Sequence, residues 1–307
     1  MKIPTAGDLA ALTQALDEQV PRLFSRFDVS PQPQPRRTRI AARWRVTAAA
    51  LRTRAAASLR GTARRRDQAS VRDQYERAWA GTAKATKLVV MAERLYAVRE
   101  PLFLNWFYVL AMAQLIQLAR PRTVLEVGSG NGFNLNCLSM LFPECVFVGL
   151  DFTEAGVRNA AATRDDPARA VNIAARFAGL MPDISVAPVS TARYFRGTGA
   201  ALPFRSRSVD LVISVLALEQ MNPIRSEVIG EIARVSRGLV AHIEPFADFN
   251  ADAFRRMHLS NKDYFRSPSS VLETAHLRPL TTWSGFPQKL NFSAGLVLAA
   301  AAEGSAS

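Results

Sequence analysis

The sequence predicts an α/β fold with a mostly parallel sheet, helices on both faces of that sheet and an N-terminal helical extension. Three runs at 124–127, 146–150 and 209–213 are short and almost continuously apolar, as in strands that are covered on both faces. A glycine-rich turn at 128–132 leads from the first run directly into a helical pattern, which is how a βαβ unit begins. With 307 residues, the chain is long enough for one full α/β domain and additional elements.

Residues 1–70 are predicted to form a helical, arginine-rich extension with a proline linker. Four apolar side chains recur at helical spacing and predict a short helix near the N-terminus: Leu9, Leu12, Leu16 and Val20. Three prolines follow at alternate positions: Pro31, Pro33 and Pro35. Because proline fixes φ and lacks an N–H group, this stretch cannot be helical, and we expect a stiff spacer.

Residues 36–66 carry most of the positive charge. They contain eleven arginines and no acidic residue, so that only +2 of the formal net charge of +13 belongs to the other residues. If this segment is helical, most of the arginines lie on one side of the helix. Six apolar side chains lie on the opposite side: Ile40, Trp44, Ala48, Leu51, Ala55 and Leu59. A basic amphipathic helix of this kind can lie on an anionic membrane, which is the preferred interpretation, or contact nucleic-acid phosphates. Packing against the rest of the protein and an unfolded arm are the alternatives.

Residues 71–120 are predicted to be a helical cap that leads into the core. Tyr75 and Trp79 are one helical turn apart. The run 102–119 is heavily apolar and almost long enough to span a membrane. However, the run is interrupted by three polar side chains: Asn105, Gln114 and Gln117. A predicted strand also follows it at once. We therefore expect a core helix that packs under the sheet.

The turn after the first predicted strand reads Glu126-x-Gly128-x-Gly130-x-Gly132. Glycine suits a strand-to-helix turn whose backbone must approach a ligand, because it has no Cβ and adopts positive φ easily. The spacing differs from the G-x-G-x-x-G of dinucleotide-binding loops, and a carboxylate precedes the first glycine. Such a carboxylate could accept a hydrogen bond from an ammonium group of a nucleoside that carries an amino acid.

Asp151 ends the second apolar run, 25 residues after Glu126. At the end of the second strand of a βαβ unit, an acidic residue can bind both hydroxyls of a ribose. Phe152 follows and could pack on an adenine ring. The alternative for Asp151 is an N-cap for the helix that begins at Thr153 and Glu154.

Three further segments complete the pattern: 201–221 with its Leu-Pro-Phe and Asp-Leu-Val-Ile-Ser sequences, the helix and strand at 231–245, and the Ser-Pro helix at 267–273 before the last apolar strand at 291–300. From about residue 121 to 301 the sequence resembles the class I S-adenosylmethionine-dependent methyltransferases. The resemblance implies a seven-stranded Rossmann-like sheet, a methyltransferase domain at 121–307 and S-adenosylmethionine as the cofactor.

The resemblance also implies which residues bind the cofactor: Glu126, Gly128, Ser129, Gly130, Gly132, Phe133, Asp151, Phe152, Thr198, Gly199, Ala200 and Leu216. Two positions depart from the family pattern. Thr198 stands where the family often has the aspartate that meets the adenine amino group, although a threonine can accept the same hydrogen bond. Gln220 replaces a histidine that could have served as a base.

Methyl transfer from a sulfonium is an in-line displacement, for which most of the rate comes from positioning in a dry site. A base is needed only when the acceptor must lose a proton. The loops after the predicted strands at 208–214 and 239–245 place Glu219, His242 and Glu244 at the carboxyl edge of the sheet, and these are the predicted catalytic residues. Strand alternation puts His242 and Glu244 on one face, so that both could point to one place.

The acceptor is less well defined. The sequence has no Asn-Pro-Pro-Tyr segment and no Pro-Cys pair, which argues against methylation of a nucleic-acid base. We expect methylation of an oxygen or nitrogen of a small-molecule, lipid or glycan acceptor. RNA methylation guided by residues 36–66 is the alternative, and a non-enzymatic scaffold that only binds the cofactor is a third.

The cysteines and the N-terminus indicate the compartment. Cys137 and Cys145 give neither a disulfide framework nor a metal-binding spacing. No signal peptide is recognisable after Met1. We expect a cytoplasmic enzyme without a metal that associates with membranes through residues 36–66.

Overall fold

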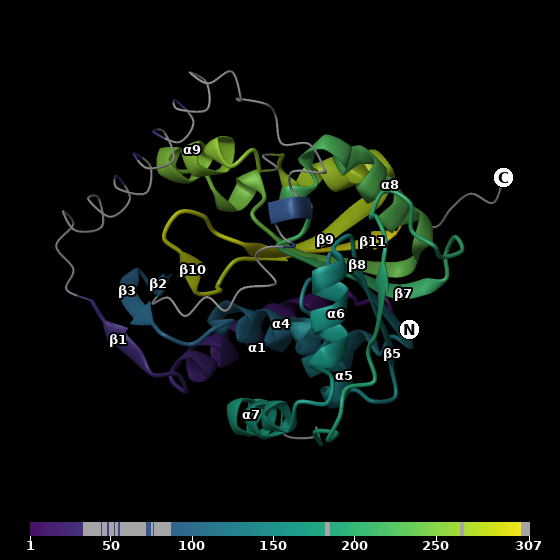
Figure 1. The fold of residues 1–307 in the computed structure, drawn as a ribbon, viewed down its shortest axis with the longest axis horizontal. Coiled ribbons are helices and arrows are strands. Elements are labelled where there is room, and N and C mark those ends of the chain that lie inside the picture. The colour runs from purple at the N-terminus through teal and green to yellow at the C-terminus, as the bar shows by residue number, and fades with distance from the viewer. Residues whose placement is uncertain are drawn as a thin grey trace.

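A seven-stranded sheet forms the centre of the computed structural model (Figure 1). The structure describes residues 1–32, 44, 48, 52, 55, 72–74, 76, 87–181, 185–264 and 267–301. The strand order is β6-β5-β4-β7-β8-β11-β9. In chain order the strands are β4 (Thr123–Val127), β5 (Val146–Asp151), β6 (Arg193–Arg196), β7 (Val209–Val215), β8 (Ser236–Glu244), β9 (Leu277–Trp283) and β11 (Gly295–Ala301).

Only β11 runs against the other strands of this sheet. Pairs β4–β5, β4–β7, β5–β6 and β7–β8 are parallel, whereas β11 is antiparallel to both β8 and β9. All seven residues of β7 are buried, as expected for a central strand with both faces covered. The predicted α/β class with a seven-stranded, mostly parallel sheet is confirmed.

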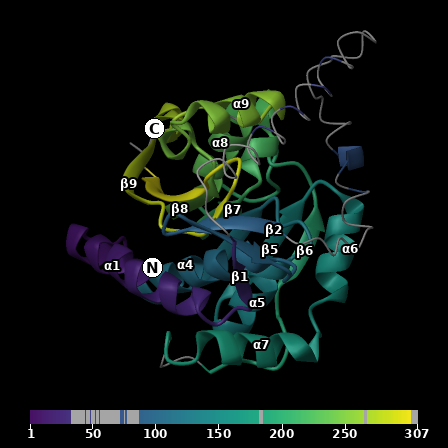
Figure 2. The same ribbon diagram turned by 90° about the vertical axis from the view of Figure 1, so that its left-hand side faces the viewer.

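Two apolar clusters fill the two faces of the sheet. The first is covered by α1 (Ala6–Phe24), α4 (Phe103–Ala119), α5 (Phe133–Leu141) and α7 (Pro167–Phe177). The second is covered by α8 (Arg225–Val235) and the 3-10 turn η4 (Ser269–Ala275). Figures 1 and 2 both show α1 beside α4, and α8 on the opposite side of the sheet. The other helices and 3-10 turns of the described residues are α6 (Glu154–Ala162), α9 (Ala253–Asn261), η1 (Leu218–Gln220), η2 (Asn222–Ile224) and η3 (Ala247–Phe249).

The predicted N-terminal helix is present as α1. Its N-cap Thr5 and Asp8 form a capping box, in which each side chain bonds the backbone N–H group of the other residue. All four apolar residues of the predicted stripe are buried, with Leu16 and Val20 at 0% exposure. The Trp283 indole of β9 donates to the Asp17 carboxylate over 2.8 Å. α1 is therefore part of the main core.

The apolar run 102–119 forms α4, and 13 of its 17 residues are buried. Its N-cap and C-cap residues, Leu102 and Arg120, both adopt left-handed backbone conformations. The prediction of a core helix under the sheet is confirmed. Within the described part of the chain, no helix combines the length and the apolar character that crossing a bilayer requires.

A second, four-stranded antiparallel sheet corrects the prediction for residues 71–120. Its order is β1-β3-β2-β10, with β1 (Val29–Pro31), β2 (Lys87–Met91), β3 (Arg94–Val98) and β10 (Gln288–Lys289). The predicted helix is wrong for 87–98, which form a β-hairpin. Its turn, Ala92 and Glu93, has positive φ at both positions, 46° and 61°. Turns of this type normally contain Asn-Gly or Asp-Gly, so the sequence carried no turn signal here.

Other expectations for the N-terminal region have mixed outcomes. Pro31 belongs to β1 at the edge of the small sheet, where a residue without an N–H group is tolerated. Pro33, Pro35, Tyr75 and Trp79 lie outside the described residues, as does residue range 36–66 apart from four positions. One of these four, Trp44, is 52% exposed and makes an edge-to-face contact with Phe254 of α9 at 5.3 Å between ring centroids. The amphipathic helix and the domain boundaries 1–70, 71–120 and 121–307 stay predictions.

Candidate functional site

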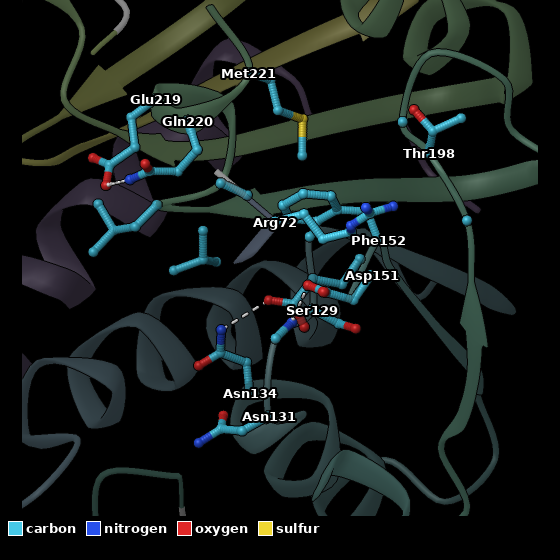
Figure 3. Close-up of a pocket in the computed structure, with 18 of the residues that line it drawn as sticks. Arg72, Ser129, Asn131, Asn134, Asp151, Phe152, Thr198, Glu219, Gln220 and Met221 are labelled. Carbon is cyan, nitrogen blue, oxygen red and sulfur yellow. Dashed lines mark hydrogen bonds between the residues drawn. The ribbon is translucent and has the colours of Figure 1, made fainter. Parts of the chain in front are cut away.

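The carboxyl ends of β4, β5 and β7 surround a cavity of about 820 Å³ (Figure 3). Its lining includes nine of the twelve residues predicted to bind the cofactor: Glu126, Gly128, Ser129, Gly130, Asp151, Phe152, Thr198, Gly199 and Leu216. In Figure 3, Asp151, Phe152 and Thr198 lie on one side of the cavity, while Glu219 and Gln220 lie on another. We call these the glycine-loop end and the Glu219 end.

The glycine loop is fixed by tight packing as well as by backbone conformation. Gly128 and Gly132 adopt φ of 80° and 72°, which side-chain-bearing residues rarely adopt. A Cβ on Gly128 would come within 2.4 Å of the Ala217 Cβ, and one on Gly132 within 2.6 Å of the Ala160 Cβ. Gly132 is therefore required for packing, and it does not line the cavity.

Asp151 ties the glycine loop to the end of β5. Its carboxylate accepts hydrogen bonds from the Gly130 N–H group at 2.8 Å and from the Thr153 N–H group at 2.9 Å. Thr153, not Asp151, is the N-cap of α6, because its hydroxyl accepts from the Gly156 N–H group at 3.2 Å. Asp151 is 5% exposed and lines the cavity. A ligand here would meet a carboxylate that is already held in place.

Glu126 is a buried carboxyl group with one unused oxygen. Its Oε1 accepts from the Asn134 side-chain amide at 2.8 Å, and Asn134 in turn accepts from the Asn105 amide. No hydrogen-bond partner for Oε2 is found among the described residues. Burial, opposed by the Asn134 hydrogen bond and reinforced by the nearby Asp151, raises the pKa of Glu126 to about 8. A cationic donor in the cavity would pair with Oε2 and favour the ionised form.

Of the other residues predicted to bind the cofactor, some line the cavity and some do not. Thr198 and Gly199 line the cavity beside Phe152, and Leu216 reaches it with a strained φ of 51°. Phe133 does not line it, since its ring packs edge-to-face on Trp106 at 5.1 Å. Ala200 also lies outside the lining. These two residues and Gly132 therefore shape the surroundings of the cavity.

Of the three predicted catalytic residues, only Glu219 lines the cavity. It is 4% exposed and lies in η1, directly after β7, where its carboxylate accepts from the Gln220 side-chain amide at 2.5 Å. Figure 3 shows this pair at one side of the cavity. The residue is thus in a position to meet a group that enters beside the glycine loop.

His242 and Glu244 correct the expectation that they point to the acceptor. Both are 0% exposed, and neither lines the cavity. They do meet at one place, the Ser214 hydroxyl of the neighbouring strand, which lies 2.8 Å from the His242 Nδ1 and donates to the Glu244 Oε1 at 2.8 Å. His242 and Glu244 therefore do lie on the same face of β8, as strand alternation predicts. That face of β8 is closed by the core.

Burial changes the ionisation of both groups. It lowers the pKa of His242 to about 3, so that the imidazole is neutral at ordinary pH. It raises the pKa of Glu244 to about 7, against three backbone hydrogen bonds and the Ser214 hydroxyl. Those backbone donors are the N–H groups of Ala217, Leu218 and Glu219. Glu244 thus holds the turn that carries Glu219.

Several lining residues were missed by sequence reasoning: Arg72, Leu102, Asn105, Asn131, Asn134, Arg196, Gly197, Val215, Ala217, Met221, Pro223, Ile224 and Lys289. Gln220 and Tyr264, which the loops after the strands were expected to bring near the acceptor, also line the cavity. Asn131 and Asn134 could have been found, since they stand in or just after the glycine loop. Lys289 carried no signal, because its position depends on the pairing of β10 with β2.

Glu76 attaches the segment that contains Arg72 to α6. Its carboxylate accepts from the N–H groups of Ala155 at 2.9 Å and Glu154 at 2.7 Å, in the first turn of that helix. These hydrogen bonds, led by that from Ala155, lower the pKa of Glu76. The positive end of the helix dipole favours the same charge. Arg72 itself lines the cavity, and Figure 3 shows it beside Phe152 at the glycine-loop end.

Comparison with known proteins agrees with the sequence motifs. Residues 125–240 match the family model described as a methyltransferase domain. A search of curated proteins finds no match. Among solved structures, magnesium protoporphyrin IX methyltransferase from Synechocystis PCC 6803 is 12% identical, with 75% of this chain and 97% of that chain covered and a TM-score of 0.48. Geranyl diphosphate C-methyltransferase from Streptomyces coelicolor A3(2) is 10% identical, with 75% and 98% covered and a TM-score of 0.47.

Proposed function

We propose that this protein transfers a methyl group from S-adenosylmethionine to an oxygen or nitrogen of a small-molecule, lipid or glycan acceptor. The premise is that residues 125–240 are a class I S-adenosylmethionine-dependent methyltransferase domain. The protein is an enzyme, and S-adenosylmethionine is its cofactor. The observation that carries the proposal is that one cavity is lined both by the glycine-loop motif and by Glu219. Donor and acceptor can thus share one space.

The size of the cavity supports this proposal. Ligand pockets commonly measure about 300–1,000 Å³, and the 820 Å³ here falls in the upper part of that range. The cofactor alone would not need the Glu219 end. A small acceptor, or the reacting end of a larger one, can therefore bind beside it.

The residues at the glycine-loop end fit the cofactor. The unused Oε2 of Glu126 can accept from the ammonium of its amino-acid part. Asp151 can bond the ribose hydroxyls, and Thr198 and Phe152 can contact the adenine. S-adenosylmethionine, when bound, supplies a methyl carbon on a sulfonium. The chain's part is to hold the acceptor in line with that carbon and to exclude water.

We expect Glu219 to accept a proton when the acceptor is a hydroxyl or a protonated amine. It belongs to a turn that Glu244 fixes through three backbone hydrogen bonds, which restricts where the carboxylate can point. For Glu244 we expect a positioning role, and for His242 a role in the core. Neither reaches the cavity.

The proposal is tested by binding and by transfer. Calorimetry with S-adenosylhomocysteine should give a micromolar Kd. A methyl-labelled cofactor added to a cell extract with the purified protein should label an extract component, whose mass then identifies the acceptor. Label that enters RNA and disappears on nuclease treatment would support the alternative of RNA methylation. Cofactor binding without any labelled component would favour the scaffold alternative.

We further propose that residues 36–66 recruit the enzyme to an anionic membrane surface. The support is the sequence alone: eleven arginines without an acidic residue. Because α1 belongs to the core, deleting residues 1–66 would damage the fold. Replacing the eleven arginines by glutamine is the better test. The variant should lose sedimentation with phosphatidylserine vesicles and keep its affinity for S-adenosylhomocysteine.

A further inference from the structure

We infer that Lys289 binds an anionic group of the acceptor, a carboxylate or a phosphate, and so makes this enzyme selective for small acids. The inference rests on the proposed function, because it concerns the other end of the same cavity. It adds a binding residue that lies outside the matched family region 125–240. It also narrows the acceptor class, because an acidic group becomes a requirement for tight binding.

The fold brings Lys289 into the cavity from the small sheet. Gln288 and Lys289 form β10, which pairs with Val90 and Val89 of β2. Lys289 lines the cavity together with Glu219 and Tyr264. The electrostatic interaction between Lys289 and Glu219 locates the amine at the Glu219 end. The residue is thus supplied by a part of the molecule that the methyl donor does not need.

The surroundings of the Lys289 amine favour an anionic ligand. Its Nζ lies 4.4 Å from the centroid of the Phe292 ring, within cation–π distance, but the ring does not neutralise the charge. Among the described residues, no carboxylate oxygen lies within ion-pair distance of this amine, and the attraction of Glu219 acts from farther away. Burial lowers the pKa of Lys289, and the nearby Lys87 acts in the same direction. An anion would compensate for both effects.

The position of Glu219 adds a second constraint on the acceptor. Tyr264 contacts the same Phe292 ring as the Lys289 amine and lines the cavity beside it. An acid held by Lys289 would extend from this point into the cavity. Its reacting hydroxyl or amine would then lie near Glu219, the residue proposed as the base. The structure therefore assigns separate tasks to two groups of opposite charge: Lys289 binds the acid, and Glu219 receives the proton.

The test compares one uncharged probe, benzamide, with anionic probes, of which benzoate has the same shape as benzamide. Full-length protein saturated with S-adenosylhomocysteine is titrated with benzoate, benzamide, phenyl phosphate and inorganic phosphate, and each Kd is measured by calorimetry or by ligand-observed NMR. We expect benzoate or phenyl phosphate to bind at least ten times more tightly than benzamide. The better of the two anions shows whether a carboxylate or a phosphate is preferred.

Variants assign the effect to Lys289. Lys289→Met should remove the preference for the anion, and Lys289→Arg should retain most of it. Arg94→Met is the matched control: Arg94 lies on the same small sheet, is exposed and does not line the cavity, so the preference should stay. S-adenosylhomocysteine affinity should change less than twofold in all three variants.

Each other result overturns the inference. Equal binding of benzoate, phenyl phosphate and benzamide, or a preference that persists in Lys289→Met, would mean that Lys289 does not recognise the acceptor. Inorganic phosphate that binds as tightly as phenyl phosphate would indicate a free-anion site. Failure of the wild type to bind S-adenosylhomocysteine would contradict the proposed function itself. This outcome can therefore be distinguished from a failure of the inference about Lys289.

Discussion

The two ends of the cavity are built in different ways. The glycine-loop end comes mainly from residues 126–131 and from Asp151 and Phe152 at the end of the adjacent strand. The Glu219 end combines a turn after β7 with Tyr264, which follows α9, and with Lys289 of β10. Local sequence therefore determines the donor side. The acceptor side depends on long-range packing, which is why its residues formed no motif.

The largest effect is expected from Glu219→Gln, which keeps the shape of the side chain and removes the base. If Glu219 accepts the acceptor proton, kcat should fall by about 10²–10⁴-fold. Affinity for S-adenosylhomocysteine should stay within twofold, because the change is confined to the Glu219 end. Steady-state rates with the identified acceptor provide the measurement. An unchanged kcat would mean that Glu219 lines the cavity but does not accept the proton.

Asp151→Ala should have the next largest effect, this time on the donor side. It removes the acceptor for the Gly130 N–H group together with the proposed ribose contact. A hydrogen bond to a charged group contributes about 1.5–3 kcal/mol, so cofactor affinity should fall by about 10–100-fold. Calorimetry with S-adenosylhomocysteine measures the loss. Micromolar binding that survives the substitution would show that the ribose assignment is wrong.

The pKa of Glu126 predicts how cofactor affinity depends on pH. With a pKa of about 8 in the free protein, this carboxyl is largely protonated at pH 7 and must ionise to pair with an ammonium. Affinity for S-adenosylhomocysteine should therefore rise between pH 6 and 8, by up to about tenfold per unit, with release of a proton on binding. Calorimetry in buffers of different ionisation enthalpy detects that proton. Glu126→Gln should remove the pH dependence, and a flat profile for the wild type would contradict the prediction.

The smallest effect concerns the hairpin that supports the acceptor side. Replacing Ala92 and Glu93 by Asn and Gly should stabilise the protein by about 1 kcal/mol, because both residues have positive φ. Thermal unfolding should show a Tm increase of a few degrees, with cofactor affinity unchanged. A lower Tm would mean that these side chains make stabilising contacts in the native protein.

The same contrast explains what could be predicted from the sequence. The strands, the glycine loop and Asp151 were predictable because each depends on neighbouring residues and on strand ends. The face shared by His242 and Glu244 was also predictable, but not whether the core closes it. The hairpin at 87–98 was missed because Ala92 and Glu93 are not turn-forming residues. Lys289 could not be found, since its role depends on a two-residue strand that pairs with a distant hairpin.

The burial of α1 has a consequence for the synthesis of the protein. Its Asp17 accepts a hydrogen bond from Trp283, and its leucines share a core with β11. A ribosome that makes residues 6–24 first must add more than 250 residues before this partner exists. Contacts of such long sequence separation form slowly. The exposed apolar face of the nascent helix would meanwhile be a binding site for chaperones.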